Sequence, residues 1–435
     1  MLTFLGFAMV LTFMYLIMTK RLSALIALIL VPILFALFGG FSGDIGPMML
    51  QGITKLAPTG VMLMFAILYF GLMIDSGLFD PAVRKILKLV KGDPLKVSVG
   101  TAALALIVSL DGDGATTYMI CVAAMLPLYS RLGMSPRIMA GLIILAGGVM
   151  NMTPWGGPTA RAASALHVDP SDIFVPMIPA MLAGVVAILA IAYMYGKRER
   201  ARLGELHLPG DEIDHSEISV SQFPDARRPK MIWFNGALTA ALMVTLVLGL
   251  LPLPVLFMVA FSIAMIANYP CLQQQKDRVA AHSGSVLAVV GLIFAAGIFT
   301  GILSGTGMVE AMSKSLLAVI PEALGPYLAV ITAIVSMPFT FFMSNDAFYY
   351  GVLPVLAEAA SHYGITPVEM ARASIVGQPV HLLSPLVPST YLLVALAGIE
   401  FGDHQRFTLK WAVLVCLCIM FAALLMGIFP LFSSL

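Results

Sequence analysis

Two aspartates stand in a short polar stretch between apolar arms. The stretch SLDGDGATT, residues 109–117, contains Asp111 and Asp113. A carboxylate at membrane depth costs at least about 2.5 to 3.5 kcal/mol on insertion scales, so both aspartates need a partner, a proton or a cation there. Gly112 and Gly114 let the backbone turn tightly and approach a ligand closely. The stretch predicts the tip of a re-entrant hairpin; a cytoplasmic loop with solvated aspartates is the alternative.

A second polar stretch, FMSNDAFYYG, covers residues 342–351. Here Ser344, Asn345 and Asp346 offer a hydroxyl, an amide and a carboxylate side by side. The helix predicted to begin after them supplies free N–H groups and the positive end of its dipole, which favour an anion. Capping of that helix by Ser344 or Asn345 is compatible with binding. The stretch therefore predicts a second hairpin tip that binds an anion.

Two further stretches are rich in proline: NMTPWGGPTARAA, which begins at Asn151, and GQPVHLLSPLVPSTY, which begins at Gly377. Prolines remove backbone donors and break a helix. Membrane proteins tolerate such breaks where the freed carbonyls line a cavity or meet a ligand. The two stretches predict discontinuous spans that face the two tips.

Two single residues in these broken spans could also do chemistry. Arg161 can clamp a carboxylate with two parallel hydrogen bonds, and its alternatives are an interface anchor or a structural partner of an aspartate. His381 is, in this interpretation, the only histidine inside an apolar segment. Its ordinary pKa near 6.5 would suit proton exchange, and a packed, hydrogen-bonded core histidine is the alternative.

The elements that position these groups must be membrane helices. Of 435 residues, 60% are hydrophobic and 11% are charged, whereas an ordinary soluble domain is roughly 25% charged. Long apolar stretches recur, and about 20 such residues cross a bilayer as a helix. The net charge of +1 and the absence of a dense basic run argue against a nucleic-acid partner. No catalytic triad, phosphate loop or Cys/His cluster stands out, so the sequence predicts an all-α integral membrane protein that is not an enzyme.

An internal repeat organises the chain at an offset of roughly 230 residues. TPWGGPT from Thr153 parallels SPLVPST from Ser384, with Pro154 over Pro385. Each half is predicted to contain five membrane crossings and one re-entrant hairpin. Because five is odd, the second half must be inverted relative to the first, as in many secondary transporters.

The predicted boundaries follow from this repeat. The first repeat covers 1–195, a cytoplasmic linker covers 196–232, and the second repeat covers 233–435. The hairpins are expected at about 95–130 and 325–360, and the broken helices at about 137–166 and 368–398. Placing both termini outside puts most of the 24 Lys and Arg residues in the cytoplasm, as the positive-inside rule requires.

At these motifs the chain resembles the bacterial citrate-metal complex:proton symporter family (CitMHS), which belongs to the ion transporter superfamily. The likeness covers essentially the whole chain and includes SLDGDGATTYMI, NMTPWGGPTARAASAL, FMSNDAFYYGVLPVLAEA and GQPVHLLSPLVPSTYLLVALAGIEF. The resemblance implies a homodimer in which each subunit has a scaffold domain and a mobile, elevator-type transport domain.

The resemblance also implies a function, the import of citrate chelated to a divalent metal such as Mg²⁺, by proton symport across the bacterial cytoplasmic (inner) membrane. The metal is part of the substrate, and no tightly bound cofactor is expected. A citrate trianion that carries a divalent cation is a monoanion, which loses less hydration energy at a buried site. The alternative is a sodium-coupled carrier, a carrier of another polycarboxylate, or a cation/proton exchanger of the same superfamily.

Applied to this sequence, the interpretation assigns two groups of residues. Metal or proton coupling is expected at Asp111, Asp113, Asp346 and His381, with Gly112, Gly114, Thr116 and Thr117 completing the first tip. Substrate binding is expected at Asn151, Thr153, Gly156, Gly157, Thr159, Arg161, Ser344, Asn345, Ser384, Ser389 and Thr390.

Overall fold

The computed structural model describes residues 1–90, 92–112, 114–203, 223–318 and 321–433, and within these ranges every regular element is a helix. Six helical segments there are long and apolar enough to cross a membrane: Ile45–Ser76 (α3), Pro170–Leu203 (α9), Pro229–Val247 (containing α10, Ile232–Val247), Leu272–Gly305 (α12), Glu322–Phe342 (containing α14, Leu328–Phe342) and Phe401–Leu425 (α19). Shorter apolar helices include Leu2–Met18 (α1), Ala24–Phe38 (α2) and Leu253–Asn268 (α11). This is the helix content of a multi-pass membrane protein.

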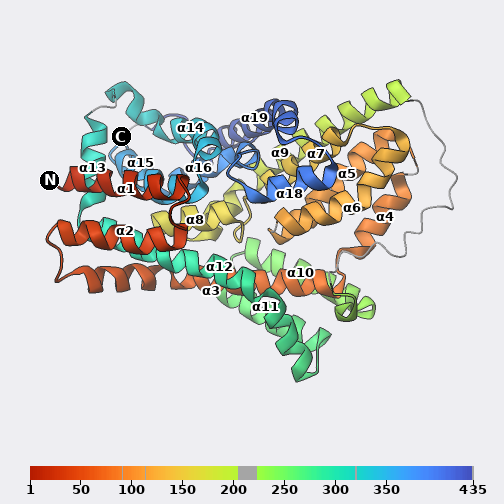
Figure 1. Cartoon of the computed structure of the whole chain (residues 1–435), viewed down its shortest axis with the longest axis horizontal. Coiled ribbons are helices and arrows are strands. Elements are labelled where there is room, and N and C mark those ends of the chain that lie inside the picture. The colour runs from red at the N-terminus through yellow and green to blue at the C-terminus, as the bar shows by residue number, and fades with distance from the viewer. Residues whose placement is uncertain (91, 113, 204–222, 319–320, 434–435) are drawn as a thin grey trace.

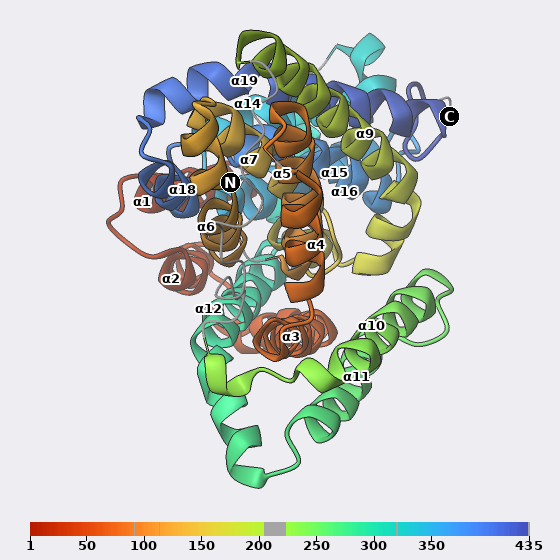
Figure 2. The same cartoon turned by 90° about the vertical axis from the view of Figure 1, so that its right-hand side faces the viewer.

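One side of the molecule is a layer formed by α2, α3, α10, α11 and α12, which we call the long-helix layer (Figure 1). Its central pair is α3 with α12, and glycines allow their backbones to approach closely. A Cβ atom added to Gly52 would lie 1.9 Å from the carbonyl oxygen of Gly297. Figure 2 shows α10 and α11 projecting away from the rest of the molecule beside α3.

The remaining helices that carry the polar motifs form what we call the hairpin body. Its N-terminal elements are Pro94–Val108 (α5), the 3₁₀ turn Ser109–Asp111, Gly114–Leu132 (α6), Pro136–Met150 (α7), Gly157–Leu166 (α8) and α9. Its C-terminal elements are α14, the π-helical turn Ala347–Val352, Leu353–Ser361 (α15), Pro367–Ser374 (α16), the 3₁₀ turn Ile375–Gly377, Gln378–His381 (α17), Pro388–Ala397 (α18) and α19. Asp80–Val90 (α4) precedes α5, and Met308–Leu317 (α13) contacts α1 and α15.

The interruption between α7 and α8 follows from local backbone chemistry. Proline occupies the first turn of α8, where its missing N–H does no harm. Gly156 precedes that helix, and a Cβ atom there would lie 2.0 Å from the carbonyl oxygen of Asn151, so only glycine fits. The chain is thereby folded tightly on itself between the two helices, and six residues, 151–156, form the first break.

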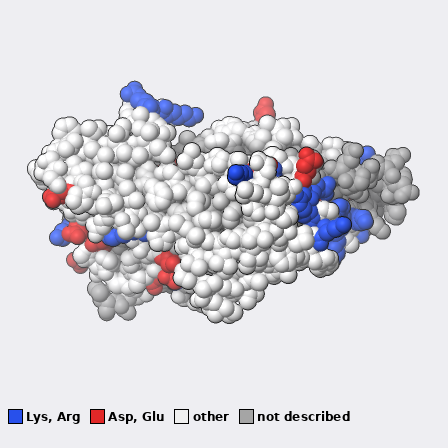
Figure 3. Space-filling model, turned by 90° about the horizontal axis from the view of Figure 1, so that it is seen from below, with Lys and Arg blue, Asp and Glu red and all other residues white. Residues whose placement is uncertain are grey.

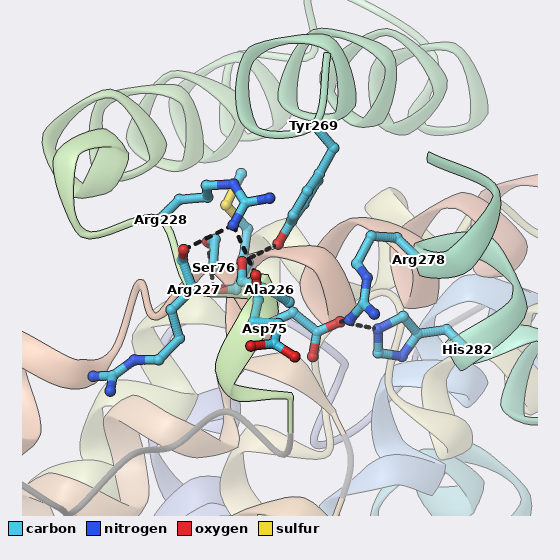
Figure 4. A network of polar contacts seen from close by, with 10 residues as sticks. Asp75, Ser76, Ala226, Arg227, Arg228, Tyr269, Arg278 and His282 are labelled. Carbon is cyan, nitrogen blue, oxygen red and sulfur yellow. Dashed lines mark hydrogen bonds and ion pairs between the residues drawn. The ribbon is translucent and has the colours of Figure 1, made fainter. Parts of the chain in front are cut away.

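A polar network joins the end of α3 to the first part of α12 and to the end of the predicted linker (Figure 4). Asp75, near the end of α3, accepts hydrogen bonds from Nη1 of Arg278 and Nε2 of His282, each at 2.9 Å. The backbone N–H of Arg228 donates to the carbonyl of Ser76 at 3.0 Å, and its guanidinium lies 4.5 Å from the ring centroid of Tyr269. The network joins a segment of the second half to the end of a helix from the first half.

Candidate functional site

A second break, residues 382–387, separates α17 from α18. The first tip and both breaks border one cavity of about 150 Å³. Its walls are Ser109, Gly112, Gly114, Thr117, Tyr118, Gly147, Asn151, Leu382 and Ser389. Segments more than 200 residues apart in the sequence therefore meet here. Asn151 and Gln378, for example, are hydrogen-bonded to each other although 227 positions separate them in the sequence. Gly112 has φ of 78° at the tip, a left-handed conformation that favours glycine.

Two hydroxyl groups in the wall of this cavity have no hydrogen-bond partner. They are Oγ of Ser109 and Oγ1 of Thr117, both buried, and the statement covers partners within the described part of the chain. An unsatisfied buried polar group costs about 1 to 3 kcal/mol, so proteins rarely keep one without a ligand or water. These hydroxyls give the cavity a polar wall suited to a ligand with oxygen atoms. Oγ1 of Thr153, in the first break, is likewise buried and unpaired there.

A chain of amides connects the first break to the second tip. The side-chain N–H₂ of Asn151 donates to Oε1 of Gln378 at 3.3 Å. Gln378 in turn donates to the hydroxyl of Tyr349 at 3.0 Å and to Oδ1 of Asn345 at 3.5 Å. Gln378 is fully buried. Sequence reasoning missed it, although its place between Gly377 and Pro379 in a broken span was the available signal.

Arg161 of α8 forms an ion pair with Asp346 of the second tip. Its Nε donates to Oδ1 at 2.6 Å, and the two side chains are only 22% and 16% exposed. A Cβ atom at Gly157 would lie 2.7 Å from Nη1 of Arg161, so the backbone at the start of α8 lies close to the guanidinium. The structural partnership with an aspartate, one of the alternatives open for Arg161, is therefore present in the structure.

Several of the predicted binding residues use their side chains on the protein backbone. Ser344 accepts a hydrogen bond from the N–H of Ala347 at 3.2 Å and caps the turn that follows. Three other predicted binding residues donate their hydroxyls to backbone carbonyl oxygens: Ser384 to Phe341 (2.6 Å), Thr159 to Met152 (2.9 Å) and Thr390 to Leu382. His381, predicted for coupling, is likewise bonded through Nδ1 to the carbonyl oxygen of Thr340 (2.7 Å). These groups hold the breaks in shape.

Of the two aspartates of the first tip, the structure describes the backbone of Asp111. Asp113 lies outside the described residues, as does the side chain of Asp111, whose backbone ends the 3₁₀ turn. Thr116 is half-buried in the first turn of α6. Elsewhere in the described ranges no three His, Cys, Asp or Glu side chains gather closely enough to share a metal ion. The coupling role of Asp111 and Asp113 stays a prediction.

His381 is not the only buried histidine among the described residues. His404 is fully buried in α19, and His282 of α12 is bonded to Asp75. His404 lies in the first turn of α19, where its polar neighbours in the sequence gave no sign of its burial, whereas His282 is the eleventh residue of α12 and is half-buried. Asp75 itself follows an unbroken apolar run, a signal that sequence reasoning passed over.

Solved structures share the fold of this chain. The YdaH transporter of Alcanivorax borkumensis matches with a TM-score of 0.54 and 15% identity, over 87% of this chain and 86% of that chain. MtrF of Neisseria gonorrhoeae matches with a TM-score of 0.56 and 15% identity, over 87% of this chain and 83% of that one. At this level of identity the likeness concerns the fold alone.

Sequence comparisons are more specific. A citrate transporter of Bacillus subtilis (strain 168) is 62% identical over 428 residues, covering 98% of this chain and 99% of that protein. The Mg²⁺/citrate complex secondary transporter of the same bacterium is 56% identical over 428 residues with the same coverage. These relatives are transporters, which confirms the expectation that the chain is not an enzyme. The model of the citrate transporter family (CitMHS) matches residues 13–377, and the chain belongs to that family.

Proposed function

We propose that this protein imports citrate as a complex with a divalent metal, Mg²⁺ or a similar ion, by proton symport. The observation that carries the proposal is the 56% identity, over nearly the full length of both chains, to a relative named as a Mg²⁺/citrate complex secondary transporter. The metal enters as cargo held by citrate.

The cavity between the first tip and the two breaks is the proposed substrate site. Ser109, Thr117, Asn151 and Ser389 place hydroxyl and amide groups on its wall, and these can donate hydrogen bonds to carboxylate oxygens. Asp111 and Asp113 belong to the same tip and are proposed to face the metal or to carry the coupled protons. Mg²⁺ prefers oxygen ligands and keeps several waters, so a metal already chelated by citrate needs few ligands from the protein.

Transport is proposed to proceed by an elevator movement of the hairpin body against the long-helix layer, with both hairpins re-entrant and the two halves inverted. The internal repeat supports inversion, and the breaks support a site near the middle of the membrane. A homodimer formed through the long-helix layer would leave each hairpin body free to move.

The proposed orientation places the linker in the cytoplasm and both termini outside. In Figure 1 the termini lie at the left end, whereas α9 ends and α10 begins at the right end. Figure 3 shows the largest group of Lys and Arg toward the right end, with scattered basic and acidic residues at the left end and uncharged atoms over most of the face between them. Arg84, Lys85 and Lys88 belong to α4, which lies toward the right end of Figure 1, and a concentration of basic residues at one end supports a cytoplasmic location.

Uptake of labelled citrate into proteoliposomes tests the proposal. Imposed proton or sodium gradients are combined with added Mg²⁺ or with complete chelation of divalent metal. The expected result is uptake that requires both the metal and an inward proton gradient. Undiminished uptake after chelation, or uptake driven by sodium alone, would contradict the proposal and favour a sodium-coupled relative.

A further inference from the structure

Trp155 stands in the first break and has two separate attachments. Its indole Nε1–H donates to the carbonyl oxygen of Leu110 in the first tip at 2.9 Å. Gly112 of the same tip lies against the ring, since a Cβ atom there would be 3.1 Å from Cδ1 of the indole. Only 6% of Trp155 is exposed. The break and the tip are thereby fastened to each other by one side chain.

The other attachment is to the long-helix layer. The ring centroid of Trp155 lies 4.8 Å from that of Phe70 in α3. It lies 5.5 Å from that of Phe257 in α11, and these two rings meet nearly edge-on. The ring centroid of Tyr69 lies 5.4 Å from that of Phe70 and 6.3 Å from that of Phe257. The hydroxyl of Tyr69 is hydrogen-bonded to that of Thr239 in α10 at 2.8 Å. Three helices of the layer therefore fix an aromatic pocket that holds a side chain of the hairpin body.

We propose that Trp155 is a positioning residue that couples closure of the first tip to docking of the hairpin body against the long-helix layer. The inference rests on the proposed movement between these two parts. Any sliding of the hairpin body along α3 and α11 must draw the ring out of its pocket. The same ring carries the Nε1–H that donates to Leu110. The hydrogen bond to the tip is therefore most stable when the hairpin body is docked against the long-helix layer.

The internal repeat places a different residue at the corresponding position of the second half. Pro154 corresponds to Pro385, so Leu386 stands at the position of Trp155. Leucine has neither an aromatic ring nor a side-chain donor, so it cannot make the two attachments of Trp155. In the second half the described bond from the break to the hairpin is that of Ser384 to the carbonyl of Phe341, which involves no ring of the long-helix layer.

Labelling of the tip tests the coupling in purified protein without substrate, so the outcome does not depend on what is transported. A cysteine replaces Leu110, whose backbone carbonyl is retained, and the more accessible native thiols Cys271 and Cys418 become serine. Trp155→Phe keeps an aromatic ring but removes the donor. We expect maleimide to label the tip about fivefold faster, the change that loss of one ordinary hydrogen bond produces.

Phe257→Leu is the decisive variant because Phe257 belongs to the long-helix layer and leaves the Trp155 to Leu110 bond intact. Coupling predicts that it also speeds labelling of the tip. Phe299→Leu is the matched control and is expected to leave labelling unchanged, because Phe299 is a buried ring of α12 in the same layer that pairs with Phe13 of α1 instead of Trp155.

Fluorescence gives an independent reading. The chain has 3 tryptophans, so Trp233→Phe with Trp411→Phe leaves Trp155 as the single emitter. Phe257→Leu should shift its emission to longer wavelength as the ring becomes more hydrated, and Phe299→Leu should not. Unchanged labelling and unchanged emission in Phe257→Leu would overturn the inference, even if Trp155→Phe did not fold.

Discussion

The Nε atom of Arg161 lies 2.6 Å from Oδ1 of Asp346, which joins the helix after the first break to the second tip across 185 residues of sequence. This pair changes what a substitution of Asp346 should do. Regarded as a lone carboxylate in a cavity, Asp346 could be replaced by asparagine without loss of stability. Because it neutralises a partly buried guanidinium, the same replacement leaves a cation without its counter-charge.

We therefore predict that Asp346→Asn and Arg161→Gln each lower both stability and uptake. Removing one partner of a largely buried pair should cost about 2 kcal/mol, less than for a fully buried pair because Arg161 is partly exposed. Uptake in liposomes should fall at least about tenfold. The double variant should recover part of the melting temperature without recovering uptake. A double variant as unstable as the sum of the two singles would show that the side chains do not depend on each other.

Thr117→Val should separate binding from folding. The hydroxyl of Thr117 is buried without a partner in the described structure, so an isosteric valine should leave the protein as stable, or up to about 1 kcal/mol more stable. Binding of magnesium citrate should weaken about tenfold if the hydroxyl bonds the ligand. Thr332→Val is the matched control, because its hydroxyl is also buried and unpaired but does not line the cavity. Calorimetry showing wild-type affinity for Thr117→Val would remove this residue from the site.

Gly52→Ala should disrupt the contact between α3 and α12. The added methyl group would lie 1.9 Å from the carbonyl oxygen of Gly297, and backbone cannot move aside as a flexible side chain can. We expect at least about 1 to 3 kcal/mol of destabilisation, measured as a lower melting temperature in detergent. Gly46→Ala in the same helix meets no atom within 4 Å and should be neutral or slightly stabilising. Equal melting temperatures for the two variants would be the contrary result.

Asp93 gives a prediction for pH. Burial opposes ionisation of this carboxyl, but Arg200 and the N–H of Leu95, each bonded to it at 3.0 Å, hold its pKa below the ordinary 3.8. A depressed pKa adds stability that is present above the ordinary value and disappears as the pH falls through the folded-state value.

Asp93→Asn should accordingly destabilise the protein by about 1 kcal/mol at neutral pH, since Arg200 is partly exposed, and by less as the medium is acidified. Asp44→Asn is the control, because Asp44 precedes α3 without a side-chain capping bond. A difference between wild type and Asp93→Asn that stays constant down to acid pH would contradict the assignment of this stability to the Asp93 carboxylate.

The features that the sequence predicts well are those that depend on local chemistry. Proline and glycine act on their own backbone, so NMTPWGGPT alone indicates an interrupted helix, and α7 ends at Met150 while α8 begins at Gly157. The apolar composition likewise predicts membrane helices without reference to their packing.

What the sequence could not predict depends on distant partners. Whether a hydroxyl in a break binds ligand or backbone is decided by which carbonyl lies nearby, and Ser384 bonds Phe341 whereas Thr117 bonds nothing in the described structure. The pairing of Arg161 with Asp346 and the amide chain through Gln378 each connect the two halves, so no single motif contains them.

The long-helix layer is built from both halves, with α3 from the first and α12 from the second, and the bond from Arg228 to Ser76 fixes the chain where it returns. The peptide connection between residues 203 and 223 is thus one of several links between the halves. Two separately encoded polypeptides, divided in that interval, should assemble in the membrane into one working transporter. Isotopes or spectroscopic probes could then be placed in one half alone.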